Sequence, residues 1–444
     1  MNMSKRELTI KITVLLLTLS LCSCGRDDLH YLETTAATAE TAATAVPFPY
    51  TPSEDGVLNY GRFRLLGKTD QFQYHDGYLY FLAGGNSTGN AKLGARAKHL
   101  VRMNVETGNV TEVCPDPLCA HDKNSDCAMY GIGSGGFIVG PDGKYYVMKV
   151  YLTPDGFVDS FVQYDAEKDT AVELDNNFTG YSYEYYTERY RIYKDNLYDE
   201  ETKTAIPRIM RTDLTTFESV QIWPKQTETA GAYEMLFIID DRLYLTDHVC
   251  LYSIDLDGEN YRVHLEGKIP IHAETDGTYV YYTDQRELCR RRLDGGAEER
   301  MGLDAIGIRL TENYVYYRSG EETVLGKARI IGYTGDVITL YGEKLCRYPL
   351  NGEGGEEVLY TFSEEIASLR PDDWIVVGNY CYGTYTYWVD PDGDGIYRDG
   401  DMVRSEPSNE NGRVLTFLRI DLTTGVADVI SVDEYGTKTE GKLK

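Results

Sequence analysis

The sequence is poor in basic residues and in long apolar runs. Its 444 residues include 44 Lys and Arg against 71 Asp and Glu, which leaves a formal net charge of −27. Nucleic acids and anionic lipid surfaces bind through clustered Lys and Arg, so this balance excludes both as partners. The run Arg290–Arg292 is too short to change that conclusion. The apolar run Ile12–Leu21 is shorter than the roughly 20 residues that cross a bilayer comfortably.

The patterns of the common catalytic classes are also missing. The sequence shows neither a phosphate-binding glycine loop nor a dinucleotide fingerprint. Histidines are few, 7 in all, and His248, His264 and His272 are scattered among expected strand ends. No Ser, His and Asp constellation is visible, although such a triad is defined by geometry rather than by sequence order. We therefore assign no catalytic residues and expect a protein that is not an enzyme.

Among the aromatic residues, phenylalanine and tryptophan are scarce, at 12 and 3, whereas tyrosine is abundant at 38. Tyrosine suits a strand with one wet edge, so most of these residues are expected to be half exposed on strands. Tyrosine also suits a surface that binds sugars or peptides.

The chain repeats one phrase along most of its length. Asp276–Tyr282 opens with a turn dipeptide before a run of Tyr and Val, and Cys289–Gly295 is a second short run that closes on Asp-Gly. Each run suits a strand, and Asp-Gly is a strong hairpin signal. Further openings begin at Asp76, Asp142, Asp195, Asp241, Glu312 and Gly378, and further closings are Arg102–Gly108, Ile209–Phe217, Tyr252–Gly258, Cys346–Gly352 and Arg419–Gly425.

Such self-similarity predicts an all-β repeat fold. Spacings of roughly 35–65 residues, about four short strands per unit and few helical patterns favour a β-propeller over a solenoid. Seven openings predict seven blades. Six or eight blades remain compatible, because residues 143–230 are irregular and residues 57–66 could complete a blade by strand exchange between the termini.

The N-terminus carries export signals. Lys5, Arg6 and Lys11 flank the apolar run, which ends in Leu21–Gly25. Leu-Cys-Ser-Cys-Gly resembles the lipobox of bacterial lipoproteins, and the resemblance makes Cys24 the lipidated first residue of the mature chain. Cys22 fits less well, because Leu21 stands where that family has a small residue. The alternative is an ordinary secretory signal.

These signals divide the chain into four parts. We expect a lipoprotein signal peptide at 1–23, a disordered tether rich in Thr and Ala at 24–55, the propeller at 56–432 and a polar tail at 433–444. A lipid anchor would hold the protein on the extracellular face of the cell membrane. We also expect the protein to be a monomer.

A cysteine-rich stretch provides one candidate metal site. Cys114, Cys119, His121 and Cys127 together form a complete tetrahedral set for a structural zinc. A disulfide is the alternative for an exported protein, and inert thiols are a third. Four protein ligands leave no position open for a catalytic water. The other thiols, Cys250, Cys289, Cys346 and Cys381, are expected to be small buried apolar groups.

A second stretch predicts a calcium loop. Carboxylates stand at the first, third, fifth and twelfth positions, with Gly395 at the sixth, as in an EF-hand loop. The expected ligands are Asp390, Asp392, Asp394, the carbonyl of Ile396, Asp399 and Asp401. Asp401 replaces the usual Glu and no helices flank the loop, so it looks closer to the calcium loops in hairpins of other propellers. The alternative is a solvated Asp/Gly turn without metal.

The two repeated phrases resemble those of the TolB-like and low-density-lipoprotein-receptor-type (YWTD) propellers. Cys114–His121 resembles a stretch in propeller lipoproteins of unknown function from Gram-positive bacteria. The resemblance covers roughly residues 57–431 and implies a binding or scaffold module for a protein, peptide or glycan. The alternative is a propeller enzyme that acts on extracellular glycans or esters. A sensor that signals across the membrane is disfavoured, because no transmembrane segment is visible.

Overall fold

The computed structural model describes 72–83, 99–114, 129, 132–140, 143–153, 156–168, 170–175, 184–187, 189–199, 203–224, 233–239, 241–267, 273–329, 337–363, 368–388, 396–398, 402–404, 415–432 and 438–442. All of them belong to the unit Pro47–Lys444, and a separate unit covers Met1–Val46.

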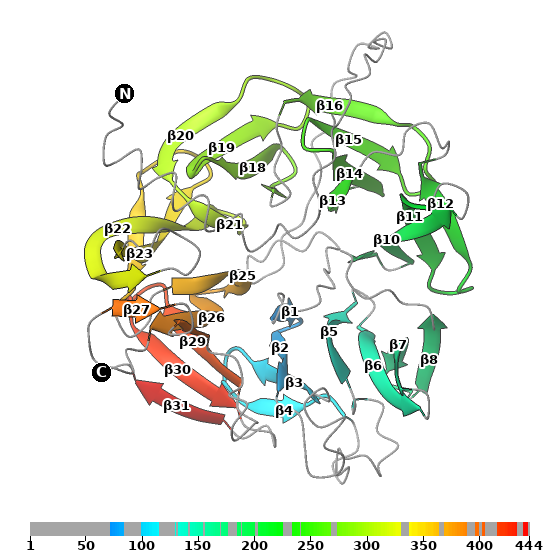
Figure 1. Ribbon diagram of the computed structural model, residues 1–444, viewed down its shortest axis with the longest axis horizontal. Helices are drawn as coiled ribbons and strands as arrows, with labels where there is room; N and C mark the ends of the chain where they lie inside the picture. Colours follow the sequence, from blue (N-terminus) through cyan, green and yellow to red (C-terminus); the bar gives the residue numbers. More distant parts are fainter. Residues whose placement is uncertain are drawn as a thin grey trace. The chain divides into compact units, whose positions relative to one another are not determined.

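Within these ranges the chain forms strands, turns and bends, without helices. The strands assemble into seven sheets, which follow one another in sequence order (Figure 1). The predicted all-β, seven-bladed β-propeller is therefore confirmed. The described segments contain no helix with the length and apolarity needed to cross a membrane.

Blades 1 to 3 each have four consecutive antiparallel strands. Blade 1 has β1 (Gln73–His75), β2 (Tyr78–Ala83), β3 (His99–Asn104) and β4 (Val110–Glu112). Blade 2 has β5 (Ile132–Val139), β6 (Tyr145–Thr153), β7 (Gly156–Asp165) and β8 (Thr170–Asp175). Blade 3 has β9 (Glu184–Tyr186), β10 (Tyr190–Asp199), β11 (Thr204–Asp213) and β12 (Ser219–Trp223).

Blades 4 to 6 repeat this plan. Blade 4 has β13 (Glu234–Ile239), β14 (Arg242–Thr246), β15 (Cys250–Asp255) and β16 (Arg262–Glu266). Blade 5 has β17 (Glu274–Thr275), β18 (Tyr279–Asp284), β19 (Glu287–Arg292) and β20 (Glu299–Asp304). Blade 6 has β21 (Ile306–Leu310), β22 (Tyr314–Arg329), β23 (Val337–Pro349) and β24 (Glu357–Thr361).

Blade 7 departs from the plan in two ways. Its strands are β25 (Ser368–Val377), β26 (Tyr380–Trp388), β29 (Leu415–Asp421), β30 (Ala427–Val432) and a fifth, β31 (Lys438–Lys442), which lies within the segment expected as a tail. Between β26 and β29 the chain adds β27 (Ile396–Arg398) and β28 (Met402–Arg404). β28 pairs with β26, whereas β27 pairs in parallel with β22 of blade 6.

The repeated phrase forms the turns that the sequence predicted, as blade 5 shows. Asp276 accepts hydrogen bonds at Oδ1 from the backbone N–H groups of Thr278 and Tyr279, at 2.8 and 2.7 Å. Gly277 takes a φ of 85°, which suits a residue without Cβ. β18 and β19 then form a hairpin in which Tyr281 faces Arg290 across the strands.

The prediction that Asp195–Tyr198 is an opening phrase is wrong. These residues lie inside β10, and the turn of blade 3 stands earlier, at 187–189. Asp195 pairs across the hairpin with Arg208, with both side chains about three-quarters buried. The four-residue match was therefore a coincidence within a longer strand, and Tyr190 begins the true second strand of the blade.

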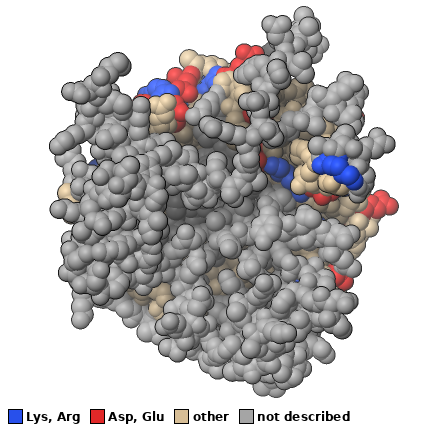
Figure 2. Space-filling model, viewed as in Figure 1, with Lys and Arg blue, Asp and Glu red and all other residues tan. Residues whose placement is uncertain are grey.

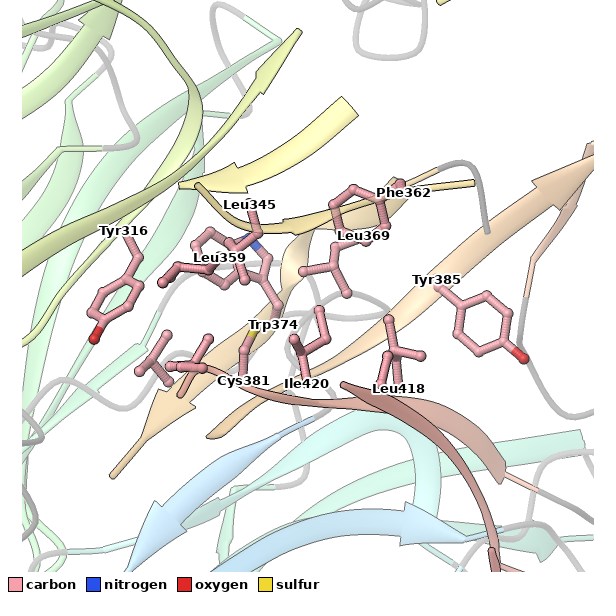
Figure 3. Close-up of a cluster of buried hydrophobic side chains, with 13 residues drawn as sticks. Tyr316, Leu345, Leu359, Phe362, Leu369, Trp374, Cys381, Tyr385, Leu418 and Ile420 are labelled. Carbon is pink, nitrogen blue, oxygen red and sulfur yellow. The ribbon is translucent and has the colours of Figure 1, made fainter. Parts of the chain in front are cut away.

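Contacts between buried side chains join each blade to the next, and most of these contacts are apolar clusters. Between blades 6 and 7, Leu345 and Leu359 pack against Trp374, Cys381 and residues of β29 (Figure 3). Similar clusters join blades 1 and 2, 3 and 4, 4 and 5, and 5 and 6. Blades 2 and 3 meet where the guanidinium of Arg191 lies 4.4 Å from the ring centre of Phe161.

The same kind of contact closes the ring. Phe72 and Phe81 of blade 1 pack against Phe417 of blade 7, with ring centres 5.1 and 5.3 Å from it. Ile430 and Val432 of β30 complete the cluster. The four main strands of each described sheet follow one another along the chain, and no described sheet combines strands from the two ends of the chain. Residues 57–66, which were candidates for strand exchange between the termini, lie outside the described residues.

Hydrogen bonds between first strands add to this packing. Gln73 donates to Phe137 O at 2.7 Å and accepts from Val139 N at 2.8 Å, which joins blade 1 to blade 2. In blade 3, the Tyr185 hydroxyl donates to Met235 O of blade 4 at 2.8 Å. In blade 5, Glu274 accepts from Leu310 N of blade 6 at 2.7 Å. A buried amide without such a partner would cost free energy, so these contacts fix the blades relative to one another.

Many tyrosines are more buried than the sequence indicated. Tyr281, Tyr282 and Tyr317 are fully buried rather than half exposed. Their hydroxyls donate to carboxylates: Tyr281 to Asp276, Tyr282 to Glu298 and Tyr317 to Glu356, at 3.0, 2.6 and 3.0 Å. A ring in the core is tolerated because its hydroxyl reaches a partner at the blade edge.

A second repeated contact pairs arginine with tyrosine. In five blades an arginine of the third strand lies over the first tyrosine of the second strand, with the guanidinium 4.5 to 5.6 Å from the ring centre. The pairs are Arg102–Tyr78, Arg211–Tyr190, Arg290–Tyr279, Arg347–Tyr314 and Arg419–Tyr380.

Candidate ligand face

The strand order gives the propeller two unlike faces. Strands alternate in direction within each sheet, so the turns after the first and third strands lie at one end of the blade. We call this end the turn face. The connection after the second strand and the link to the next blade lie at the other end, which we call the link face. Ala305 alone joins β20 to β21, a link too short to reverse a blade.

The turn face carries short connections. Among the turns that follow the first strands, the shortest includes 76–77 and the longest is 140–144. Among the turns that follow the third strands, the longest is 350–356. Many of these turns are closed by a side chain that caps the backbone. Asp213 accepts from Thr215 N at 2.8 Å, and Asp421 accepts from Thr423 N at 2.8 Å. Because these turns use their polar side chains to cap their own backbone, those groups are not free to bind a partner.

The link face carries the long connections. They are residues 84–98 in blade 1, 113–131 between blades 1 and 2, and 389–414 in blade 7. The hairpin of β22 and β23 also extends on this side, with strands of 16 and 13 residues. Insertions on one face of a rigid scaffold are where binding residues concentrate in proteins.

Both candidate metal segments fall within connections that begin and end on this face. Cys114 follows β4 at the start of the 113–131 link, where its half-buried side chain packs against the cluster between blades 1 and 2. Cys119, His121 and Cys127 lie outside the described residues, as does Cys24. Nearby, burial raises the pKa of Glu112 to about 7.

The calcium candidate lies in the blade 7 connection. Ile396 begins β27 and stands opposite Lys327 of β22 in the parallel ladder. The remaining ligands, Asp390, Asp392, Asp394, Asp399 and Asp401, fall outside the described residues. Among the residues that the structure does describe, no three His, Cys, Asp or Glu side chains are grouped to hold a metal.

The remaining cysteines are packing residues. Cys289, Cys346 and Cys381 are buried, as expected, whereas Cys250 is half buried. Burial raises the pKa of the Cys289 thiol to about 11. This thiol is protonated at neutral pH and is therefore a poor nucleophile.

Several carboxylates of blade 5 are paired with arginines. Arg300 contacts Asp284, Glu287 and Glu298 at 2.7, 3.0 and 2.9 Å, and Figure 2 shows acidic and basic side chains side by side over this blade. Arg286 binds both oxygens of Asp304 at 2.9 and 2.8 Å. Burial alone would raise the pKa of Asp304, but the hydrogen bond from Arg286 holds it below its usual value. This carboxylate stays ionised and acts as a structural anion.

The candidate segments could be recognised in the sequence, but the face that their connections share was not predicted. The signal was present in the repeat itself. Each opening phrase marks a turn after a first strand, so any insertion between an opening and its closing phrase must fall on the opposite side.

Known proteins resemble this chain only in three dimensions. No protein-family model matches the sequence, and no curated protein matches it. A prolyl endopeptidase structure aligns with 86% of this chain at 11% identity and a TM-score of 0.46. This chain spans only 51% of that peptidase.

Two further solved structures align over most of their own length. One is a chain of a nidogen/laminin complex, with 65% of this chain covered and 94% of the other, 11% identity and a TM-score of 0.33. The other is an oligogalacturonate lyase in complex with manganese, with 90% and 97% covered, 12% identity and a TM-score of 0.31.

Proposed function

We propose that this protein is a lipid-anchored binding module on the extracellular side of the membrane, and that the link face holds its ligand. The observation that carries the proposal is the asymmetry between the two faces. The connections 84–98, 113–131 and 389–414 all begin and end on one side, whereas the connections that begin and end on the other side are short. The ligand is a protein, peptide or glycan of the cell surface.

The proposed lipid anchor would keep the module close to its ligands. Lipidation at Cys24 and the segment 24–55 would hold the propeller near the membrane and leave it free to turn. Tethering raises the effective concentration of the module for ligands in the same envelope, so a modest affinity is sufficient. Zinc or a disulfide at the Cys114 segment, and calcium at the Asp390 segment, would stiffen the two longest connections of the face.

Photo-crosslinking from two exposed valines tests the assignment of the face. Val249, 57% exposed, lies on the link face after β14, and Val426, 52% exposed, lies on the turn face before β30. A photoreactive amino acid is placed at each position in the full chain, and intact cells are irradiated. We expect a specific adduct from position 249 and none from position 426. Equal labelling from both positions, or none from either, would refute the proposal.

A further inference from the structure

A chain of hydrogen bonds crosses the outer part of blade 4 and ends on blade 5. Arg242 of β14 donates to Ser253 Oγ through Nη2 and Nε, at 2.9 and 3.2 Å. Ser253 Oγ lies 2.7 Å from His264 Nε2, and His264 Nδ1 lies 3.1 Å from the carbonyl oxygen of Leu293. Leu293 follows β19 of blade 5, so the imidazole connects the two blades.

The partners of this chain determine where the protons lie. Arginine has only donors, so both of its hydrogen bonds occupy the lone pairs of Ser253 Oγ. The serine proton is then free to point at His264 Nε2, which must accept it. Nδ1 therefore carries the ring proton and donates it to Leu293 O. The neutral imidazole is satisfied at both nitrogens, and Ser253 is fully buried.

The charged groups around His264 are mostly cationic. Arg242 approaches His264 from β14, and Arg262 lies on β16, the strand of His264 itself. Arg291 of blade 5 donates to Glu266 O at 2.7 Å. The Tyr244 ring of β14 lies 5.1 Å from the imidazole. Asp255, the carboxylate of β15, is already bound to Arg242 and to the Asn260 amide.

We propose that His264 is a proton-operated latch between blades 4 and 5, closed when the imidazole is neutral and released by protonation in mildly acidic medium. A proton on Nε2 would point at Ser253 Oγ, which has no lone pair left to accept it. It would also add a third positive charge beside Arg242 and Arg262. The conflict at Ser253 displaces the ring, so that its hydrogen bond to Leu293 O is lost and the apolar cluster that contains Leu265 and Leu293 loosens.

The direction of the pH dependence follows from the site. Burial lowers the pKa of His264, and the two arginines lower it further against the hydrogen bond to Leu293 O. In the unfolded chain the pKa of a histidine is about 6.5. The folded state therefore binds the proton less well than the unfolded state does. The stability that His264 contributes is fully present above the unfolded pKa and is lost as the pH falls below it.

Hydrogen exchange measured by mass spectrometry on the whole chain tests the latch. Exchange is compared at pH 7.5 and 5.0 after correction for the intrinsic rate. We expect peptides of β16 and of residues 291–296 to lose at least about tenfold in protection at pH 5.0, while blade 1 is unchanged. In His264→Gln this extra loss should disappear, because glutamine can accept and donate without titrating. The matched control, His248→Gln on the same blade, should behave as the wild type does.

A second measurement needs no variant. Exchange of the C2 hydrogen of each histidine reports the titration of that ring in the wild-type protein. His264 should titrate below the value of an unperturbed histidine. Titration at or above about 6.5 would overturn the proposal, as would equal protection of the seam at both pH values.

Discussion

Arg242 is the first residue of β14, as Tyr279 is of β18, so in blade 4 an arginine stands where blade 5 has the tyrosine that its arginine contacts. In blade 5, Arg290 reaches from the third strand to lie 4.5 Å from the Tyr279 ring centre. In blade 4, Ser253 holds the position of Arg290, and Arg242 reaches it from the second strand at 2.9 Å. In both blades one guanidinium lies between the second and third strands. It comes from the third strand in blade 5 and from the second strand in blade 4.

Arg290→Gln should destabilise the propeller by about 1–2 kcal/mol, because the Tyr279 contact and the 2.8 Å pair with Glu299 are both lost. Urea unfolding measures the change. The matched control is Arg292→Gln, since the half-exposed side chain of Arg292 pairs with Asp294 at the surface. That variant should leave the midpoint unchanged. Equal shifts in the two variants would mean that the tyrosine contact contributes nothing.

Gln73→Leu should cost about 2–4 kcal/mol, since Phe137 O and Val139 N would be left buried without their partner. The substitution keeps the volume similar, so lost packing is not the cause. The urea midpoint should fall at constant slope, whereas Val172→Ala, at an exposed position of β8, should leave it in place. An unchanged midpoint for Gln73→Leu would show that this clamp does not hold blades 1 and 2 together.

Cys24→Ala should abolish lipid labelling and leave either uncleaved precursor or soluble protein. The reason is that only a cysteine at the cleavage site provides the thiol that is acylated. Cys22→Ala is the control and should label as the wild type does. Normal labelling of Cys24→Ala would place the anchor elsewhere or remove it.

The segment Cys114, Cys119, His121 and Cys127 should hold one zinc or one disulfide. Native mass spectrometry would show the added mass of one zinc, which is lost on denaturation. A disulfide would instead remain on denaturation as a loss of two hydrogens. Rapid alkylation of all these thiols in the folded protein, with neither mass change, would exclude both structures.

Millimolar calcium should raise the melting temperature of the wild type relative to chelator, because a ligand that binds only the folded state stabilises it. The double variant Asp392→Ala/Asp394→Ala should show no such difference. If wild type and variant melt alike in calcium and in chelator, the 390–401 segment is a turn without metal.

The sequence was sufficient to predict the blades because each phrase encodes local structure. Asp276–Tyr282 makes a turn and β18 with the contacts of its own residues, and the blade count follows from repetition. Asp195 shows the limit of this approach, since a four-residue match cannot distinguish a turn from the middle of β10. Tyr281 shows another, because its burial depends on Asp276 and on the neighbouring blade.

Contacts between distant segments could not be predicted at all. The parallel pairing of Ile396 with Lys327 joins an insertion of blade 7 to a hairpin of blade 6. The bond between His264 and Leu293 O joins two phrases that look independent in the sequence. Neither leaves a periodic trace, because each depends on the angle at which two complete blades meet.

The contact of Phe72 with Phe417 makes the joint between the first and last blades the same in kind as the other six. At each joint the side chains of two neighbouring sheets pack together, and the four main strands of each described sheet follow one another along the chain. The added strand β27 crosses from the blade 7 insertion to the sheet of blade 6. The place where the polypeptide begins is therefore incidental to the ring. A circular permutant opened at Ala305, with its old ends joined, would present the same seven interfaces in the same cyclic order.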